Sequence, residues 1–368
     1  MGEVPVMAPH SKTVDTMKNE HVCFNTRKNI RIITTLLLIT GTLYLLTRLF
    51  MPKYDATVIE GALIAEYYGE EKGHDLIIIG DCEVYANFSP AVLWREFGIN
   101  SYIRGSAQQL IWQSHYLLED TLNHERPPVV LFNVLSLMYD EPQREAYNRM
   151  SLEGMRWSGA KVRAIRASMM AEEQFLDYVF PILRYHSRWS ELSAQDVSHM
   201  FRTDTVSHNG MLMDVGVRPV EFIPEPRLLA NYDFGENARM YLDKMRELCH
   251  REGIELILIK APSLYPHWYD EWEAQVVAYA TEHDLAYINF LDLVDEIGID
   301  FATDTFDAGL HMNLAGAEKL SLYLGEYLLN ETVLADRRGE PALAAIWDGK
   351  LARYDAERQR LEGERDAE

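Results

Sequence analysis

A cysteine stands directly after a short apolar run in the sequence DLIIIGDCEV, residues 75–84. Cys82 follows Gly-Asp at the point where a strand is expected to end, a place where many hydrolases hold a serine nucleophile. A thiol attacks an acyl carbon once a base removes its proton, and a histidine held by a carboxylate is such a base. The loop TDTFDAGLHMN, residues 303–313, supplies Asp307 and His311. These three side chains can form a Cys/His/Asp triad.

Alternatives stay open for the cysteine and for the acid of this triad. Cys82 is also interpretable as a small apolar core residue in a site that has lost its chemistry, because free cysteines are often buried and inert. Asp304 competes with Asp307 as the partner of the histidine, and either acid can be a solvated loop residue. We favour Asp307.

Five short apolar runs predict the strands that position these groups. They alternate with helical patterns, and that alternation predicts a parallel sheet with helices on both faces. We therefore expect an α/β fold, a three-layer α/β/α domain with a parallel five-stranded sheet. The runs are 76–79, 101–104, 129–134, 254–260 and 286–290.

Ligands of open α/β sheets bind beyond the carboxyl ends of the strands. Four of the runs end on candidate groups, which are Asp81 with Cys82, Gly105, Asn133 and Lys260. Taken singly, Gly105 can merely permit a tight turn and Asn133 can cap a loop.

An aromatic-rich loop follows the fourth run in the sequence LIKAPSLYPHWYDEW, residues 258–272. Aromatic planes beside polar groups suit the binding of a sugar or polymer, although such a loop can equally be a packed lid. Tyr265 and Trp268 are therefore candidate substrate-binding residues, together with Asp81 and Lys260.

Residues 136–235 interrupt the alternation of strands and helices. A segment of this length is rarely a bare loop, so we expect a mostly helical insertion that serves as a cap or binds a partner. The predicted map is a cytoplasmic tail 1–31, a transmembrane anchor 32–51, a linker 52–73, the α/β domain 74–335 and a solvated, charged C-terminal helix or tail 336–368 with a frayed end.

The run IITTLLLITGTLYLLTRLFM, residues 32–51, is long and apolar enough to cross a bilayer as a helix. A cleaved signal peptide is the alternative, but no small-residue cleavage site follows. Three basic residues within 27–31 precede the run, against Arg48 and Lys53 at its end. The positive-inside rule thus favours a single-pass protein with a cytoplasmic N-terminus and an extracytoplasmic domain.

In their order along the chain, these blocks resemble the SGNH, or GDSL, hydrolase superfamily, in particular membrane-anchored bacterial members related to cell-envelope acyl-transfer proteins. The resemblance covers residues 74–327. Gly80-Asp81-Cys82 is similar to the Gly-Asp-Ser block, and HMNLAGAEKLS to the H-x-N-x-x-G continuation of the histidine block. The resemblance implies a catalytic His311, and an oxyanion hole made by the backbone N–H groups of Cys82 and Gly105 with the Asn133 amide.

Two positions depart from the pattern of that superfamily. The acid usually stands three residues before the histidine, where this chain has Ala308, and Asp307 stands four before. Cysteine replaces serine as well, and a thioester passes its acyl group to an alcohol or amine more readily than an oxygen ester does. Chemistry therefore favours transfer over plain hydrolysis.

Composition limits the classes of function. The formal net charge is -22, with 35 basic against 57 acidic residues, which argues against nucleic-acid binding. Three distant cysteines suggest neither a disulfide framework nor a zinc site, and no metal or organic cofactor is indicated.

The leading hypothesis is a membrane-anchored esterase or acyltransferase acting on O-acyl groups of a cell-envelope polymer such as a surface polysaccharide. A catalytically silent scaffold for envelope assembly is the alternative from another class. A thioesterase or lipase for soluble substrates is the third, although a diffusing substrate needs no tethered enzyme.

Overall fold

The computed structural model describes residues 1–2, 13–51, 60–200 and 205–367, so parts of the predicted tail (3–12) and linker (52–59) lie outside the described residues. The chain divides into two compact units. Unit 1 comprises Met1–Pro52 and Val179–Arg202, and unit 2 comprises Lys53–Tyr178 and Thr203–Glu368. Each unit is described by itself below.

Unit 2 is built on a parallel five-stranded sheet with the order β2-β1-β3-β4-β5. Each strand coincides with one of the five apolar runs, so the predicted sheet is confirmed. Gly80 pairs with Gly105 across β1 and β2, which brings the ends of these two strands to the same edge. The strands are β1 (Leu76–Gly80), β2 (Ser101–Gly105), β3 (Val129–Asn133), β4 (Glu255–Lys260) and β5 (Ala286–Asn289).

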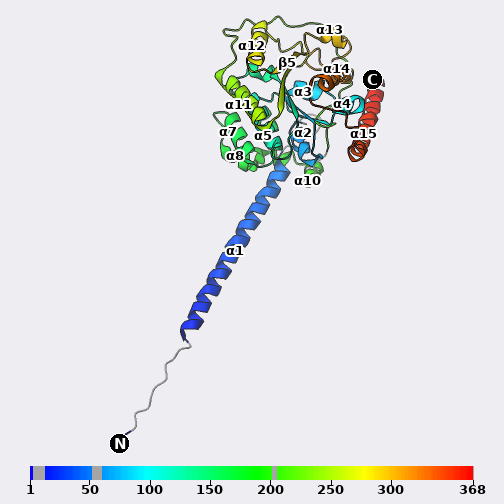
Figure 1. The fold of residues 1–368 in the computed structure, drawn as a ribbon. Helices are drawn as coiled ribbons and strands as arrows, with labels where there is room; N and C mark the ends of the chain where they lie inside the picture. The colour runs from blue at the N-terminus through cyan, green and yellow to red at the C-terminus, as the bar shows by residue number, and fades with distance from the viewer. Residues whose placement is uncertain (3–12, 52–59, 201–204, 368) are drawn as a thin grey trace. The chain divides into compact units, whose positions relative to one another are not determined.

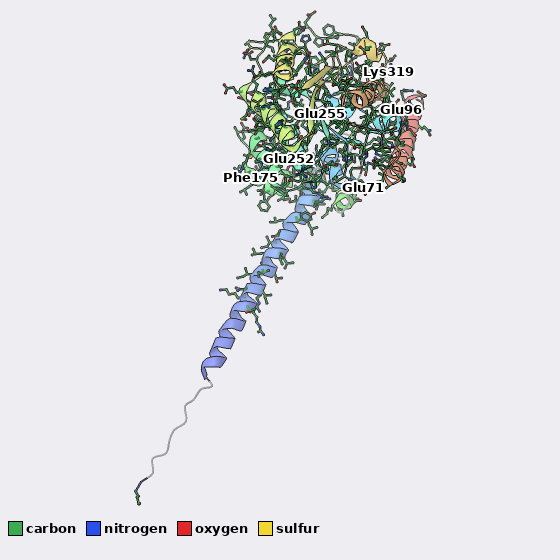
Figure 2. The ribbon with its side chains drawn as sticks, in the orientation of Figure 1. Glu71, Glu96, Phe175, Glu252, Glu255 and Lys319 are labelled. Carbon is green, nitrogen blue, oxygen red and sulfur yellow. The ribbon has the colours of Figure 1, made fainter. Side chains whose placement is uncertain are left out.

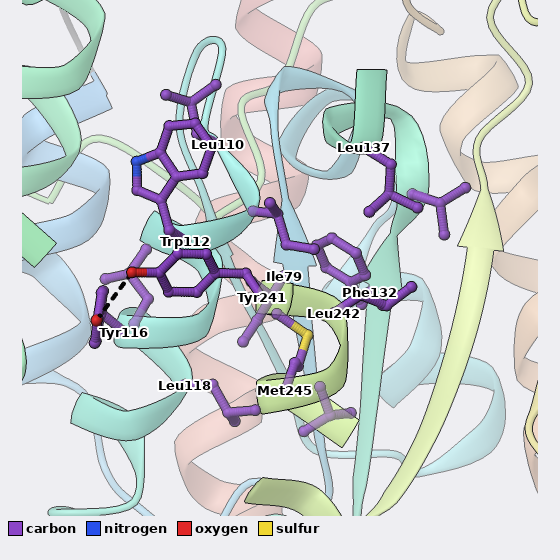
Figure 3. Close-up of a cluster of buried hydrophobic side chains, with 14 of the residues drawn as sticks. Ile79, Leu110, Trp112, Tyr116, Leu118, Phe132, Leu137, Tyr241, Leu242 and Met245 are labelled. Carbon is purple, nitrogen blue, oxygen red and sulfur yellow. Dashed lines mark hydrogen bonds between the residues drawn. The ribbon is translucent and has the colours of Figure 1, made fainter. Parts of the chain in front are cut away.

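Alternate strand residues face two separate apolar layers, as the period of two along a strand requires. Ile79 and Phe132 pack with Trp112, Tyr241 and Met245 in the layer that Figure 3 shows. That layer is covered by α5 (Ile111–Thr121), α11 (Glu236–Glu252) and α12 (Asp270–Glu282), and the opposite layer by α3 (Cys82–Asn87), α4 (Pro90–Phe97) and α14 (Leu314–Glu331). The three-layer α/β/α prediction is therefore confirmed (Figure 1).

The predicted insertion 136–235 is helical only over its first part. η2 (Val134–Met138), α6 (Glu145–Gly154), α7 (Gly159–Ser168) and α8 (Phe175–Val179) come first, followed in unit 1 by α9 (Ile182–Tyr185), η3 (His186–Ser190) and α10 (Ala194–His199). Residues 212–235 form neither helix nor strand. Before them, the Asn209 carbonyl accepts from Ile103 N at 2.9 Å, which covers the free edge of β2.

Helices at both ends of unit 2 join its core, so the α/β domain extends beyond the predicted bounds 74–335. α2 (Glu60–Glu66) and η1 (Tyr67–Gly69) occupy most of the described part of the predicted linker and bury Leu63, Ile64 and Tyr67. α15 (Pro341–Arg365) is not the solvated, frayed tail that was expected. It buries Trp347 and Tyr354, which are seven residues apart and so share one helix face.

Side chains hold α15 in place on unit 2. The ring of Trp347 stacks on that of Trp94, with centroids 5.3 Å apart, and Tyr354 donates to Glu318 of α14 at 3.0 Å. α14 also carries Lys319, which is labelled in Figure 2. A short α13 (Val294–Ile297) precedes the loop that leads to α14.

Unit 1 contains the long helix α1 (Thr13–Phe50). Within Thr26–Phe50, an 18-residue window has a mean hydropathy of 1.7 and none of that window is buried, so this stretch is long and apolar enough to cross a membrane. A signal sequence near the N-terminus can also meet this criterion of length and apolar composition.

Candidate active site

Cys82 is the first residue of α3, directly beyond the carboxyl end of β1. Asp81 caps this helix, because its carboxylate accepts a hydrogen bond from Glu83 N at 3.1 Å. The turn is closely packed. A Cβ at Gly105 would lie 2.5 Å from a methyl group of Val84, so a glycine is required where β2 passes the start of α3.

His311 lies on a loop that the same helix positions. Met312 N donates to the side chain of Asn87, the last residue of α3, at 2.8 Å. Asn313 caps α14 directly afterwards. Within the loop Ala308 has φ 63° and Gly309 has φ 93°, and this left-handed turn accommodates the additional residue between Asp307 and His311.

Asp307 holds His311 through two hydrogen bonds. Its carboxylate oxygens lie 2.6 Å from Nδ1 of the ring and 2.8 Å from the backbone N of His311. The ring of Phe306 stacks against the imidazole at 5.7 Å. Asp304, the rival acid, instead accepts from Lys319 Nζ at 2.6 Å and from Asp300 N at 2.8 Å.

The thiol of Cys82 lies beside the ring of His311, close enough for each group to shift the pKa of the other. Because Nδ1 contacts Asp307, Nε2 is the nitrogen left for Cys82. The structure thus brings Cys82, His311 and Asp307 together into one chain of contacts, from residues more than 200 positions apart in the sequence.

The electrostatic interactions among these three side chains favour a protonated His311. Burial lowers the pKa of His311, but the hydrogen bonds with Asp307 and Cys82 outweigh it and raise the pKa to about 11. Burial raises the pKa of the Cys82 thiol, and the hydrogen bond with His311 opposes that rise. The raised pKa of His311 therefore favours its imidazolium form near neutral pH.

A buried ion pair lies beside the nucleophile turn. Lys260 Nζ is 3.1 Å and 3.3 Å from the two oxygens of Glu83, and it also donates to the Ala261 carbonyl at 2.5 Å and to Ser263 Oγ at 2.9 Å. Both charged side chains are almost completely buried. The expectation that Lys260 binds substrate is wrong, since its ammonium is enclosed by protein acceptors.

The amide of Asn133 belongs to the same network. Its nitrogen donates to Asp81 at 3.1 Å and to Glu83 at 2.7 Å, and its oxygen accepts from Ala261 N at 3.1 Å. Both amide hydrogens are therefore used, so in this arrangement Asn133 has no donor left for an oxyanion. The expectation for Asn133 is corrected accordingly.

Asp81 faces inward and is also unavailable to a ligand in solution. Burial and the negative charge of Glu83 raise its pKa to about 7. Its oxygen is already shared by the cap of α3 and by the amide of Asn133. Its place in the structure indicates that Asp81 positions the turn and does not bind substrate.

The two aromatic candidates differ in exposure. Tyr265 is exposed. It lies near Tyr139, whose pKa is raised by burial and, to a smaller extent, by Asp81, Cys82 and Tyr265. Trp268 is instead packed against Phe234 and Trp272.

A shallow hollow of about 450 Å³ lies beside the buried Trp268. Leu264 lines it as well, and its backbone N donates to Gly309 in the histidine loop at 2.8 Å. The hollow therefore adjoins the loop that carries His311. Its other lining residues are Ile223, Pro224, Glu225, Pro226, His267 and Leu291.

Sequence reasoning missed three residues of this region. Glu83 and Ser263 neutralise and enclose Lys260, and Tyr139 lies near Cys82. The sequence contained a signal for Glu83, because Asp81 and Glu83 flank Cys82 at the start of a helix that follows a buried strand. A buried carboxylate needs a cation or hydrogen-bond donors beside it. Among the described residues no cluster of His, Cys, Asp and Glu has the geometry of a metal site.

Comparisons with known proteins give little. No protein-family model matches the chain, and no curated protein matches it. One solved structure similar to it is a protein from Bacteroides fragilis NCTC 9343 that is provisionally named an acylhydrolase. The two are 10% identical, the match covers 76% of this chain and 99% of that chain, and the TM-score is 0.37.

Proposed function

We propose that unit 2 is an acyl esterase or acyltransferase of the SGNH type. Cys82 is the nucleophile, His311 the proton acceptor and donor, and Asp307 the group that fixes the tautomer of His311. The observation that carries the proposal is that Cys82 lies beside His311, and that the His311 ring contacts Asp307 at 2.6 Å, at the carboxyl edge of a parallel sheet.

The reaction has two stages. The site first loses one proton, so that the Cys82 sulfur is a thiolate beside the His311 imidazolium. The sulfur then bonds to the acyl carbon while the ester C–O bond breaks, and the leaving alcohol takes the proton of His311 Nε2. In the second stage water or an acceptor alcohol gives its proton to His311, attacks the thioester and releases the thiolate. Water gives hydrolysis, and an alcohol gives transfer.

Backbone N–H groups are the remaining candidates for the oxyanion hole. The N–H of Cys82 lies at the start of α3, and Gly105 lies opposite Gly80 at the same sheet edge. Asn133 is left out of the hole because Asp81 and Glu83 engage its amide hydrogens.

The substrate we propose is an O-acyl group on a cell-envelope polymer. Two observations support this: the apolar stretch Thr26–Phe50, and the basic residues within 27–31 that precede its central part. An anchored enzyme with its N-terminus in the cytoplasm presents unit 2 to the envelope, where polymers that cannot diffuse to a soluble enzyme are found.

A silent scaffold for envelope assembly is the second candidate, and the structure contains specific observations in its favour. The Asn133 amide is engaged internally, and burial raises the pKa of the Cys82 thiol. A thiol that stays protonated beside an incomplete oxyanion hole is a poor nucleophile.

Intact-mass spectrometry of the full-length chain in detergent decides between the two candidates. The protein, with Cys23→Ser throughout, is exposed to p-nitrophenyl acetate, and one acetyl adduct that maps to Cys82 is expected. Cys82→Ala and His311→Ala should lose it, while Cys82→Ser should retain part of the activity. Cys249→Ala is the control, because Cys249 is buried with its pKa raised to about 12 and should not react. An unmodified Cys82 across the alkaline range would refute the enzyme proposal.

A further inference from the structure

A short segment of unit 1 is fixed to the end of the apolar helix α1. This juxtamembrane segment runs from Val179 to Arg202 and includes α9, η3 and α10. Arg188 Nη1 donates to the carbonyl of Phe50, the last residue of α1, at 2.6 Å. Arg48, two residues before that end, donates through Nε to the Met200 carbonyl at 3.0 Å. The middle and the C-terminal part of the segment are thus tied to the last turn of α1.

These contacts set the depth of the segment relative to a membrane. The last carbonyl groups of a helix have no partner within the helix, and in hydrocarbon an unpaired carbonyl costs several kcal/mol. Arginine donors at such a position belong at the boundary between hydrocarbon and water, where the charged group reaches the polar layer. The last turn of α1 therefore marks that boundary, and the segment bonded to it lies at the same level.

The segment exposes large apolar side chains at this level. Trp189 is 72% exposed, and Phe180, Leu183 and Val197 are exposed as well. By contrast, five of the seven tryptophans of the chain are buried within unit 2. Tryptophan combines a large apolar ring with one N–H donor, and this is why it is enriched at membrane interfaces.

We propose that the juxtamembrane segment lies in the interfacial layer of the membrane that α1 crosses, with Phe180, Leu183, Trp189 and Val197 in contact with lipid. The proposal rests on α1 being a membrane anchor. Lipid is the occupant because none of the apolar window of α1 is buried, and the bilayer around that window is continuous with the layer at the last turn of α1. Arg184, Arg188 and Arg202 stand against Glu191 and Asp196, a net formal charge of only +1, so the segment lacks the basic cluster that an anionic headgroup would require and a zwitterionic lipid suffices.

Quenching of tryptophan fluorescence by brominated lipid tests this contact. The full-length chain is reconstituted into phosphatidylcholine vesicles whose acyl chains carry bromine either near the headgroup or near the bilayer centre. The described part of α1 contains no tryptophan, so quenching reports on the other unit 1 residues and on unit 2. We expect bromine near the headgroup to quench more strongly, and Trp189→Phe to abolish most of the quenching.

Trp157→Phe is the matched control. Trp157 is the other exposed tryptophan, at 53%, but it belongs to unit 2. This variant should be quenched like the wild type, and the double substitution Phe180→Ser/Leu183→Ser should weaken the quenching of Trp189.

Alkaline carbonate extraction of the same vesicles separates the two ways to fail. If the chain stays in the membrane but Trp189→Phe is quenched like the wild type, the interfacial contact is overturned while the anchor stands. If carbonate extracts the chain, the anchor and the contact are both overturned.

Discussion

Removing the charge of Lys260 should destabilise unit 2 more than removing one partner of an exposed ion pair does. In Lys260→Met the carboxylate of Glu83 loses its cation in a place that water does not reach, and only the hydroxyl of Ser263 and the amide of Asn133 remain as its side-chain donors. Breaking a buried ion pair by removing one partner typically costs about 3 to 5 kcal/mol. We expect a loss in that range, because the lysine side chain is completely buried.

A double-mutant cycle separates the ion pair from the loss of packing. Glu83→Gln leaves the Lys260 ammonium with the Ala261 carbonyl and Ser263 Oγ as acceptors, so it should cost about 2 to 4 kcal/mol. In Glu83→Gln/Lys260→Met no charge is left unpaired. We therefore expect the double variant to be more stable than the sum of the single losses predicts, by at least about 2 kcal/mol.

Urea unfolding of the full-length chain in detergent, followed by near-ultraviolet circular dichroism, measures these free energies. Arg126→Met is the control, because Arg126 is largely exposed where it pairs with Glu252 at 3.2 Å, and its loss should cost below about 1 kcal/mol. If Lys260→Met costs no more than Arg126→Met, or if the two single losses are additive, the reasoning about a buried pair is wrong.

Three further predictions concern the site. The pKa of Asp81 is raised to about 7 in the folded chain, so folding favours the protonated form and the free energy of unfolding should fall as pH rises from about 4 to about 7. Asp81→Asn preserves the helix cap and should remove up to about 4 kcal/mol of that fall, as measured by urea unfolding at several pH values. The Cys82–His311 pair must lose one proton before the thiolate exists, and the pKa of the Cys82 thiol is raised, so the rate of acetylation measured by intact mass should still be rising with pH in the alkaline range; a flat profile would contradict the assignment. Ala308→Gly should change the free energy of unfolding by less than about 1 kcal/mol, because φ is already positive at this position. Gly309→Ala should cost about 1 to 3 kcal/mol, because its Cβ would lie 2.9 Å from Val220. Equal shifts of the melting temperature in the two variants would contradict this reasoning.

The sheet was predictable because each strand is a continuous apolar run. Strands buried on both faces leave no other arrangement for residues 76–79 or 129–134, and their alternation with helices fixes parallel pairing. The helical character of α15 was predictable too. Its burial was not predicted, because the inner-face residues Trp347, Leu351, Tyr354 and Leu361 are spread among many charges.

The contact between Asp307 and His311 shows what spacing alone leaves undetermined. An acid four residues before a histidine reaches the ring only if the chain turns back between them, and the left-handed conformations of Ala308 and Gly309 provide that turn. Alanine adopts this conformation rarely, so the sequence pattern gave no reason to expect it. The neighbouring Asp304 was equally plausible by distance along the chain, and Lys319 is what engages it.

Ligands of open α/β sheets bind at the carboxyl ends of the strands, and this rule selected Asp81, Asn133 and Lys260 together with Cys82 because all four lie at that edge of the sheet. It cannot distinguish a group that faces a ligand from a group that neutralises its neighbours, since both must stand at that edge. Burial makes the distinction: Lys260 and Asn133 are enclosed and fully bonded to protein groups, while Cys82 remains partly exposed beside His311. The enclosed charges hold the start of α3, and through it the sulfur, at the position from which His311 can reach it. Loss of Lys260 should therefore impair acylation of Cys82 as well as stability.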